Sequence, residues 1–426
     1  MKEPVLSLAR LLLAMPAMDK HERDYLALQT HLMQSRWPLV WKSIVASKMP
    51  ENVVVEQGRG CTTLVIRGIH LTSGVDRRAE AVLQAGQIPD DAQEAWVYGL
   101  ALGDLPRVLL ERRKLRKLHV VVMDGGTALF SLTRFDHMDW LQDERVEFHL
   151  AWNLPQLGSP FCVVPSCLRL SSDAAVGLRD ALVIELAAPS RLAEQRRIAS
   201  IQRRQEDESR DYWQRDPDVR DLFGRSEGKR VVVLGGGPTL SLREAWLQAN
   251  RDKVYMVAVT TALRPLAQMG LVPDVAVVIE PREGTLAHLE GLDGEKYKGV
   301  PLVYVPGVRR ETLEKWMGPR CVAYLDSERF DRYAEEMPRG RLFCSGTVLH
   351  AAVDLAVQGG AAEVVLVGAD FCFPMGRSHA SGAFGERDVA GEHLYRVRNG
   401  RGEEVASASN LIMYLRDLEI YIREHP

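Results

Sequence analysis

The sequence of 426 residues lacks the features of a membrane span, a nucleic-acid surface or a zinc site. No uninterrupted run of 18 apolar residues occurs, so no transmembrane helix or membrane insertion is expected. The formal net charge is only -3, which argues against a dedicated nucleic-acid surface. The six cysteines form no C-x-x-C pair and have no histidine at zinc spacing, so we expect buried thiols and no metal site.

A recognisable secretory signal is also missing. Val5 to Met18 is apolar, but Arg10 lies inside it and no small-residue cleavage site follows. We therefore expect an amphipathic core helix there and a cytoplasmic protein. The length predicts two to three domains, and 46% hydrophobic with 26% charged residues is ordinary for a globular chain.

The clearest motif is the stretch Arg230 to Leu240, RVVVLGGGPTL. Its apolar residues predict a buried parallel strand, which three glycines and a proline follow directly. Thr239 is expected to cap a helix that runs from about Ser241 to Ala249. This geometry receives a phosphate, because the missing Cβ atoms let the backbone approach the ligand. No lysine follows as in a P-loop, so a Walker-type NTPase is not indicated, and a tight turn without a ligand is the alternative.

The pattern of strands and helices divides the chain. From Arg230 onward they alternate, as in a doubly wound α/β domain. An earlier strand, glycine turn and helix starts near Glu94 and leads to Asp124-Gly125-Gly126, as Rossmann-like and methyltransferase-like domains begin. Because its glycine pattern is loose, we predict a degenerate domain that binds nothing, completed by strands that include Leu182 to Ala187. The predicted segments are 1–90 (helices and a β-hairpin), 91–190 (Rossmann-like), 191–229 (charged helical linker) and 230–426 (the α/β domain).

Small and polar residues follow nearly every predicted strand of the α/β domain. In such sheets the ligand crevice lies outside the carboxyl ends of the strands. The candidate nucleotide-binding residues at these ends are Gly235, Gly236, Gly237, Thr239, Thr260, Thr261, Glu280, Ser345, Gly346 and Thr347. The simpler alternative for each is a helix cap or a turn residue.

Two further residues are candidates for catalysis. Asp370 follows the predicted strand Val364 to Val367, and His379 lies in the glycine-rich loop after it. An imidazole titrates near neutral pH and can take a proton from an attacking hydroxyl. The alternatives are that Asp370 only braces its own turn and that His379 is one structural histidine among 11.

The segment from Arg230 onward resembles the motility-associated factor (Maf) flagellin glycosyltransferases. The matching pieces, in order, are VVVLGGGPTL, VTTALRPLAQMGLVPDVAVVIEP, CSGTVLHAAVDLAVQGGAAEVVLVGADF and GRSHASG. Upstream, YGLALGDLPRVLLE and VVVMDGGTALF resemble the Rossmann-like domain that these proteins carry. The resemblance implies an α/β protein with a sialyltransferase-like (GT-A-variant) Rossmann-type C-terminal domain, related to the 6-hydroxymethylpterin diphosphokinase MptE-like domain. A degenerate Rossmann-like N-terminal domain precedes it.

The resemblance also implies a reaction. A nonulosonic acid of the pseudaminic or legionaminic type moves from a CMP-sugar to Ser or Thr hydroxyls of flagellin, without a tightly bound cofactor. Carried over by motif, Gly235, Gly237 and Thr239 cradle the phosphate, Ser345 to Thr347 continue the nucleotide pocket, Asp370 organises the site and His379 is the general base. Backbone amides and hydroxyls can stabilise the departing phosphate without a metal, so we expect direct displacement with inversion. Three departures, Thr239 for Ser, Phe371 for Leu and Glu280 for Asp, leave the donor sugar open.

Other functions stay open on the sequence. Archaeal 6-hydroxymethylpterin diphosphokinases, which move a pyrophosphate from ATP, share the domain type but are shorter and lack the upstream domain. A non-catalytic flagellar assembly protein would keep the same scaffold. Loss of the His379 loop would favour this alternative, but the loop is present. A methyltransferase that uses S-adenosylmethionine at residues 94–126 has the weakest support. The sequence does not fix the oligomeric state.

Overall fold

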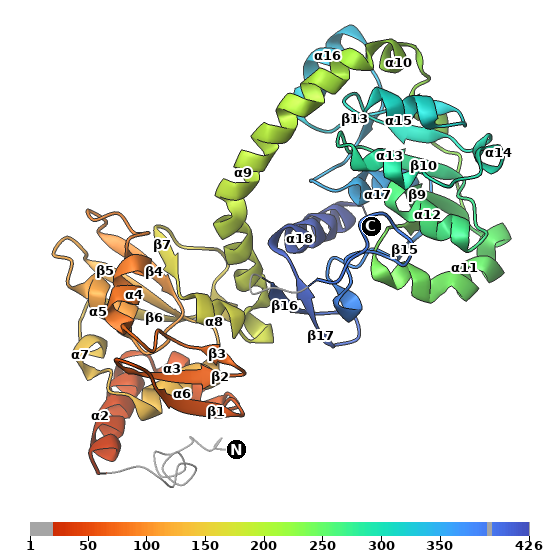
Figure 1. Ribbon diagram of the computed structural model, residues 1–426. Coiled ribbons are helices and arrows are strands. Elements are labelled where there is room, and N and C mark those ends of the chain that lie inside the picture. The colour runs from red at the N-terminus through yellow and green to blue at the C-terminus, as the bar shows by residue number, and fades with distance from the viewer. Residues whose placement is uncertain (1–19, 390–393, 426) are drawn as a thin grey trace. The chain divides into compact units, whose positions relative to one another are not determined.

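The computed structural model describes residues 20–389 and 394–425, and the chain divides into two compact units, 1–185 and 186–426 (Figure 1). The helix expected over Val5 to Met18 lies outside the described residues. The predicted segment 1–90 and all but the last five residues of the predicted segment 91–190 fall in the first unit, and the segment 191–229 belongs to the second. In the described part of the chain, no helix combines the length and the apolar character needed to span a bilayer.

The first unit is built on a parallel sheet of four strands in the order β6-β5-β4-β7. These strands are β4 (Glu94–Tyr98), β5 (Lys117–Val122), β6 (Val146–Leu150) and β7 (Phe161–Val163). A small antiparallel sheet of β1 (Val53–Gln57), β2 (Thr62–Ile66) and β3 (Ile69–His70) includes the predicted hairpin. The helices are α2 (Lys20–Arg36), α3 (Pro38–Ala46), α4 (Arg77–Ala85), α5 (Asp104–Leu110), α6 (Gly125–Arg134), α7 (Met138–Leu141) and α8 (Pro165–Arg169).

A helix of 33 residues, α9 (Val176–Glu208), contains the boundary between the two units. The strand predicted at Leu182 to Ala187 is therefore wrong, because these residues are helical. A short apolar run such as this one fits a buried strand and a buried helix equally well when only its periodicity is considered.

The second unit is built on a parallel sheet of six strands in the order β12-β11-β10-β9-β8-β15. Every neighbouring pair is parallel, which confirms the Rossmann-type α/β fold. The strands are β8 (Arg230–Leu234), β9 (Tyr255–Val259), β10 (Val275–Val278), β11 (Leu302–Tyr304), β12 (Arg320–Val322) and β15 (Glu363–Val367). The side chains from Val231 to Leu234 are fully buried, and each contributes about 1.5–3 kcal/mol of burial free energy.

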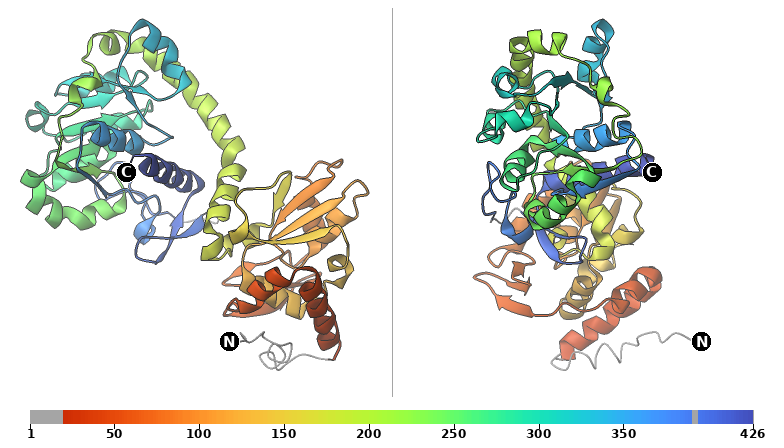
Figure 2. Two further views of the ribbon diagram at one scale, coloured as in Figure 1. Left: turned by 180° about the vertical axis from the view of Figure 1, so that it is seen from behind. Right: turned by 90° about the vertical axis from the view of Figure 1, so that its right-hand side faces the viewer.

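The helices of the second unit form layers on the two faces of the sheet (Figures 1 and 2). They are α10 (Arg210–Arg215), α11 (Glu244–Asn250), α12 (Thr260–Gln268), α13 (Gly284–His288), α14 (Gly294–Tyr297), α15 (Arg310–Lys315), α16 (Asp331–Glu336), α17 (Val348–Gln358) and α18 (Ser409–Glu424). Because strand crossovers are right-handed, α12 on the outward path and α17 on the return path cover opposite faces. Two short strand pairs, β13 (Tyr324–Leu325) with β14 (Arg341–Leu342) and β16 (Tyr395–Arg398) with β17 (Glu404–Ser407), complete the unit.

The strand order fixes where a ligand site belongs. From β8 the chain builds outward through β9, β10, β11 and β12, and it then returns to place β15 on the other side of β8. The order reverses between β8 and β15, so the topological switch point lies at their carboxyl ends. Gly235 to Gly237 and Gly368 to Asp370 follow these two strands directly.

Candidate functional site

The glycine turn after β8 is bonded to the end of β15. The amide of Gly235 donates to the Val367 carbonyl (2.8 Å), and that of Gly237 donates to the Gly368 carbonyl (2.9 Å). A Cβ on Gly235 would lie 2.3 Å from the Gly368 oxygen, and one on Gly237 would lie 2.3 Å from an Asp370 oxygen. These glycines are therefore required by the packing of the protein against itself, whether or not a ligand binds.

Thr239 has a different role from the predicted helix cap. Its amide donates to Asp370 Oδ2 (2.9 Å), and its hydroxyl donates to Oδ1 of the same carboxylate. The residues from Pro238 to Arg243 form a 3-10 helix, and the α-helix α11 begins only at Glu244. The predicted cap is wrong because the Thr239 hydroxyl donates to the charged Asp370 carboxylate, which follows another strand, instead of capping a helix.

Asp370 is a partly buried carboxylate that braces the turn. Burial raises its pKa, and the two hydrogen bonds from Thr239 work in the opposite direction. The amides of Gly235, Gly237 and Thr239 are thus all used within the protein. Among the residues that the structure describes, only the Gly236 amide of this turn has no hydrogen-bond partner. The expected phosphate cradle is reduced to that single donor in this conformation.

The loop that carries His379 closes over the turn. The Ala380 amide donates to the Gly236 carbonyl (2.9 Å), and the Ser381 amide donates to the Ser241 hydroxyl (3.2 Å). On its other side Gly236 is in close contact with Thr261, whose Oγ1 would lie 2.5 Å from an added Cβ. The structure therefore brings together the glycine turn, Thr261 and the His379 loop.

His379 is held in a mostly neutral state. Burial lowers its pKa, a hydrogen bond to the Gly385 backbone partly offsets this effect, and the charge of Arg387 lowers the pKa further. Its Nδ1 lies 3.1 Å from the Ser378 hydroxyl. A neutral imidazole at this edge of the sheet can accept a proton, as the sequence predicted for His379.

A second histidine, His288, which sequence analysis missed, interacts electrostatically with His379, and its ring centroid lies 6.0 Å from that of Phe384. His288 ends α13, and its Nδ1 is 3.2 Å from the hydroxyl of Thr260, the first residue of α12. Burial lowers the pKa of His288 to about 4, and the charges of His379 and Arg264 add to the effect. The available signal was weak: His288 is a polar residue on the connection that follows β10.

The predicted Ser345-Gly346-Thr347 segment is bonded to the C-terminal helix α18. The Ser345 hydroxyl donates to Asp417 (2.5 Å), and a Cβ on Gly346 would lie 2.6 Å from the Tyr414 ring. Thr347 is the N-cap of α17, as the simpler alternative predicted. This segment and the glycine turn are anchored by different parts of the chain, and the nucleotide contacts of both stay predictions.

Glu280 belongs to an ion-pair network that reaches α9. Arg282 lies 3.6 Å from Glu280 and 2.5 Å from Glu194 of α9. The Arg197 hydrogen bond, together with Arg282, lowers the pKa of Glu194 to about 2. The part of α9 predicted to be a solvated linker therefore forms an ion pair with the segment that follows β10.

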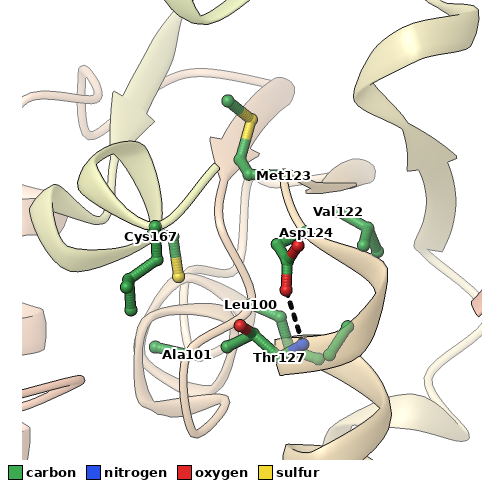
Figure 3. A pocket seen from close by; sticks show the side chains of 9 residues that line it. Leu100, Ala101, Val122, Met123, Asp124, Thr127 and Cys167 are labelled. Carbon is green, nitrogen blue, oxygen red and sulfur yellow. Dashed lines mark hydrogen bonds between the residues drawn. The ribbon is translucent and has the colours of Figure 1, made fainter. Parts of the chain in front are cut away.

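The first unit has a small hollow where a Rossmann-like domain would hold a nucleotide (Figure 3). Leu100, Asp124 and Cys167 are among the side chains that line it. Its volume is about 10 Å³, roughly the space that one water molecule needs. Asp124 accepts a hydrogen bond from the Thr127 amide (2.7 Å) and so caps α6. This hollow has no room for a nucleotide.

The chemistry available at the second unit's site is that of hydroxyls, carboxylates and two neutral imidazoles. All six cysteines are free thiols. In residues 20–389 and 394–425, no group of three or more histidine, cysteine, aspartate or glutamate residues is arranged to hold a metal ion. Proton transfer by His379 is the chemistry that this arrangement favours.

A family model and a solved structure are similar to the chain. No curated protein matches the chain. The structure of a Maf glycosyltransferase from Magnetospirillum magneticum AMB-1 is similar, with 16% sequence identity, a TM-score of 0.40 and coverage of 93% of this chain and 70% of that one. A family model described as "6-hydroxymethylpterin diphosphokinase MptE-like" matches residues 207–376. The MptE-like resemblance that the motifs predicted is therefore confirmed for residues 207–376.

Proposed function

We propose that the second unit transfers a nonulosonic acid of the pseudaminic or legionaminic type from a CMP-sugar to Ser or Thr hydroxyls of flagellin. The observation that carries the proposal is the neutral imidazole of His379 at the switch point of the sheet. Ligands of open α/β sheets bind at this place, and the reaction needs one base for a neutral acceptor. The motifs that resemble the Maf family supply the donor and acceptor classes.

The reaction divides among the residues as follows. The acceptor oxygen attacks the anomeric carbon of the sugar, the bond from that carbon to the CMP phosphate breaks, and CMP leaves with the bonding electrons. His379 takes the proton of the acceptor hydroxyl. The Gly236 amide and the Thr261 hydroxyl are the donors that we assign to the departing phosphate, where charge develops. Asp370 acts through the turn, because its hydrogen bonds to Thr239 fix the backbone that presents Gly236.

A second candidate is transfer of pyrophosphate from ATP to 6-hydroxymethylpterin. The family-model match over residues 207–376 favours it. That match ends three residues before His379, so the proposed base itself lies outside it. The two candidates therefore differ in what they require of His379, as well as in their nucleotides.

Nucleotide binding gives the first test. The full chain is heated with CMP, with ATP plus 6-hydroxymethylpterin, or with S-adenosylmethionine. A ligand present at about 100 times its dissociation constant adds roughly 2.7 kcal/mol of apparent stability, which is easily measured. We expect a rise with CMP that Glu280→Gln reduces and that Glu290→Gln, at an exposed position in the same connection, leaves intact.

Two outcomes would contradict the proposal. A rise with ATP and the pterin alone would favour pyrophosphoryl transfer. No rise with any nucleotide, together with binding of flagellin, would favour a non-catalytic assembly protein.

A further inference from the structure

A second polar hollow, of about 300 Å³, lies in the second unit between the end of α9 and α16. Figure 1 shows these two helices side by side next to α10. The hollow shares no lining residue with the candidate site. Charged or hydroxyl-bearing side chains line it throughout, so its surface is mostly polar. We call it the α9–α16 hollow.

The buried residue that lines this hollow is Glu206, whose carboxylate is already paired with a cation. Glu206 is only 2% exposed, and its side chain is paired with Arg329. The Tyr333 hydroxyl donates a second hydrogen bond to Glu206 (2.9 Å). Because these partners satisfy the buried carboxylate, it does not need a further cation from solvent.

Two guanidinium groups, one on each wall, keep unused donors. Arg332 donates to the Tyr333 hydroxyl (2.6 Å), which fixes the guanidinium near Glu206 and leaves other N–H groups free. Arg203, on the facing helix, makes no hydrogen bond or ion pair with any residue that the structure describes. An anion between the two would accept hydrogen bonds from both walls and reduce their mutual repulsion.

The balance of charge is positive. Four guanidinium groups, including the exposed Arg210 and the Arg329 beneath, meet three carboxylates. Asp207 is paired with Arg210 (2.8 Å), and Glu206 is paired with Arg329, which leaves Glu336 as the carboxylate that opposes an incoming anion. The excess is small, so binding should weaken as salt screens the exposed charges.

We propose that the α9–α16 hollow binds the phosphoryl group of a small polar ligand, such as a sugar phosphate or a nucleotide. The tetrahedral oxygens of a phosphoryl group match the forked donors of Arg203 and Arg332. The hollow lies at the lower end of the size range for small-molecule sites. This site is independent of the proposed transfer reaction, and binding alone tests it.

The test is a calorimetric titration of the full chain with glucose 6-phosphate, inorganic phosphate and glucose in low-salt buffer. We expect both phosphates to bind, glucose not to bind, and the Arg203→Gln, Arg332→Gln double variant to bind at least about tenfold more weakly. The single variant Arg203→Gln retains the Arg332–Tyr333 contact and should show the loss in a protein that folds normally. Arg204→Gln is the matched control, because Arg204 is the next residue, pairs with Glu208 and does not line the hollow.

Two results would overturn the assignment. One is the absence of phosphate binding at low salt, or glucose binding as strong as that of its phosphate. The other is phosphate binding that persists unchanged in both Arg203 variants, which would place the bound anion elsewhere in the molecule.

Discussion

Replacing Asp370 by asparagine should leave the fold intact although the residue is partly buried and hydrogen-bonded. Burial raises the pKa of Asp370, so the folded protein accommodates the neutral carboxyl better than the carboxylate. An asparagine can accept from the Thr239 amide through its oxygen and donate to the Thr239 hydroxyl through its nitrogen. We therefore expect the free energy of unfolding of Asp370→Asn to stay within about 1 kcal/mol of wild type.

The sign of the pH dependence follows from the same shift. An unfolded aspartate titrates near its ordinary value of 3.8, and the pKa of folded Asp370 lies above it. The stability that this group contributes is fully present below 3.8 and is lost as pH rises through the folded pKa. Because asparagine does not titrate, the free energy of unfolding of wild type minus that of Asp370→Asn should fall above pH 3.8 and then level off.

Thr239→Val is the contrasting change. Valine keeps the volume but removes the hydroxyl donor, which leaves one oxygen of the partly buried Asp370 carboxylate without its partner. Loss of a hydrogen bond to a charged group costs about 1.5–3 kcal/mol. Urea unfolding of both variants at several pH values measures these differences. A larger loss for Asp370→Asn than for Thr239→Val at neutral pH would refute the reasoning, because it would show that the charge itself stabilises the turn.

Three more predictions use the same structure. Burial lowers the pKa of His379, so the rate of sugar transfer should be flat near neutral pH and fall only as the pH drops through a value below 6.5; a fall centred above 6.5 contradicts this. Gly237→Ala should lower the free energy of unfolding, measured in urea, by about 1–3 kcal/mol. The control Gly299→Ala, which has open space around it, should change this free energy little. Equal effects of the two substitutions would count against the packing role of the turn. Because the hollow beside Asp124 is so small, S-adenosylmethionine should not bind there, and protection of the α6 amides from hydrogen exchange by this compound would contradict the prediction.

Local sequence signals predicted the strands and turns of the second unit, and they did not predict the partners of the side chains. The run from Val231 to Leu234 indicates a buried strand because its neighbours in sequence share its character. The role of Thr239 depends on Asp370, which is 131 residues away, and no local pattern reveals that contact. The 3-10 turn before α11 could not be predicted for the same reason, since tertiary contacts decide it.

The segment expected to be a linker shows a similar limit. Its mixed charges indicate a solvated helix, and most of these side chains are indeed exposed. However, Glu194 pairs with Arg282, and Glu206 is buried against Arg329. His288 was missed because a single histidine carries no pattern, and only the fold brings it within the electrostatic influence of His379.

The central claim is that His379 is the base in a sugar transfer. The most direct measurement is the mass of flagellin after incubation with the full chain and CMP-pseudaminic or CMP-legionaminic acid, with release of CMP followed in parallel. We predict that flagellin gains sugar mass as CMP is released, and that His379→Gln slows both by about 10²-fold or more while His31→Gln, at an exposed site in the first unit, does not. Transfer that continues unchanged in His379→Gln would contradict the account, as would formation of AMP from ATP and 6-hydroxymethylpterin with no sugar transfer.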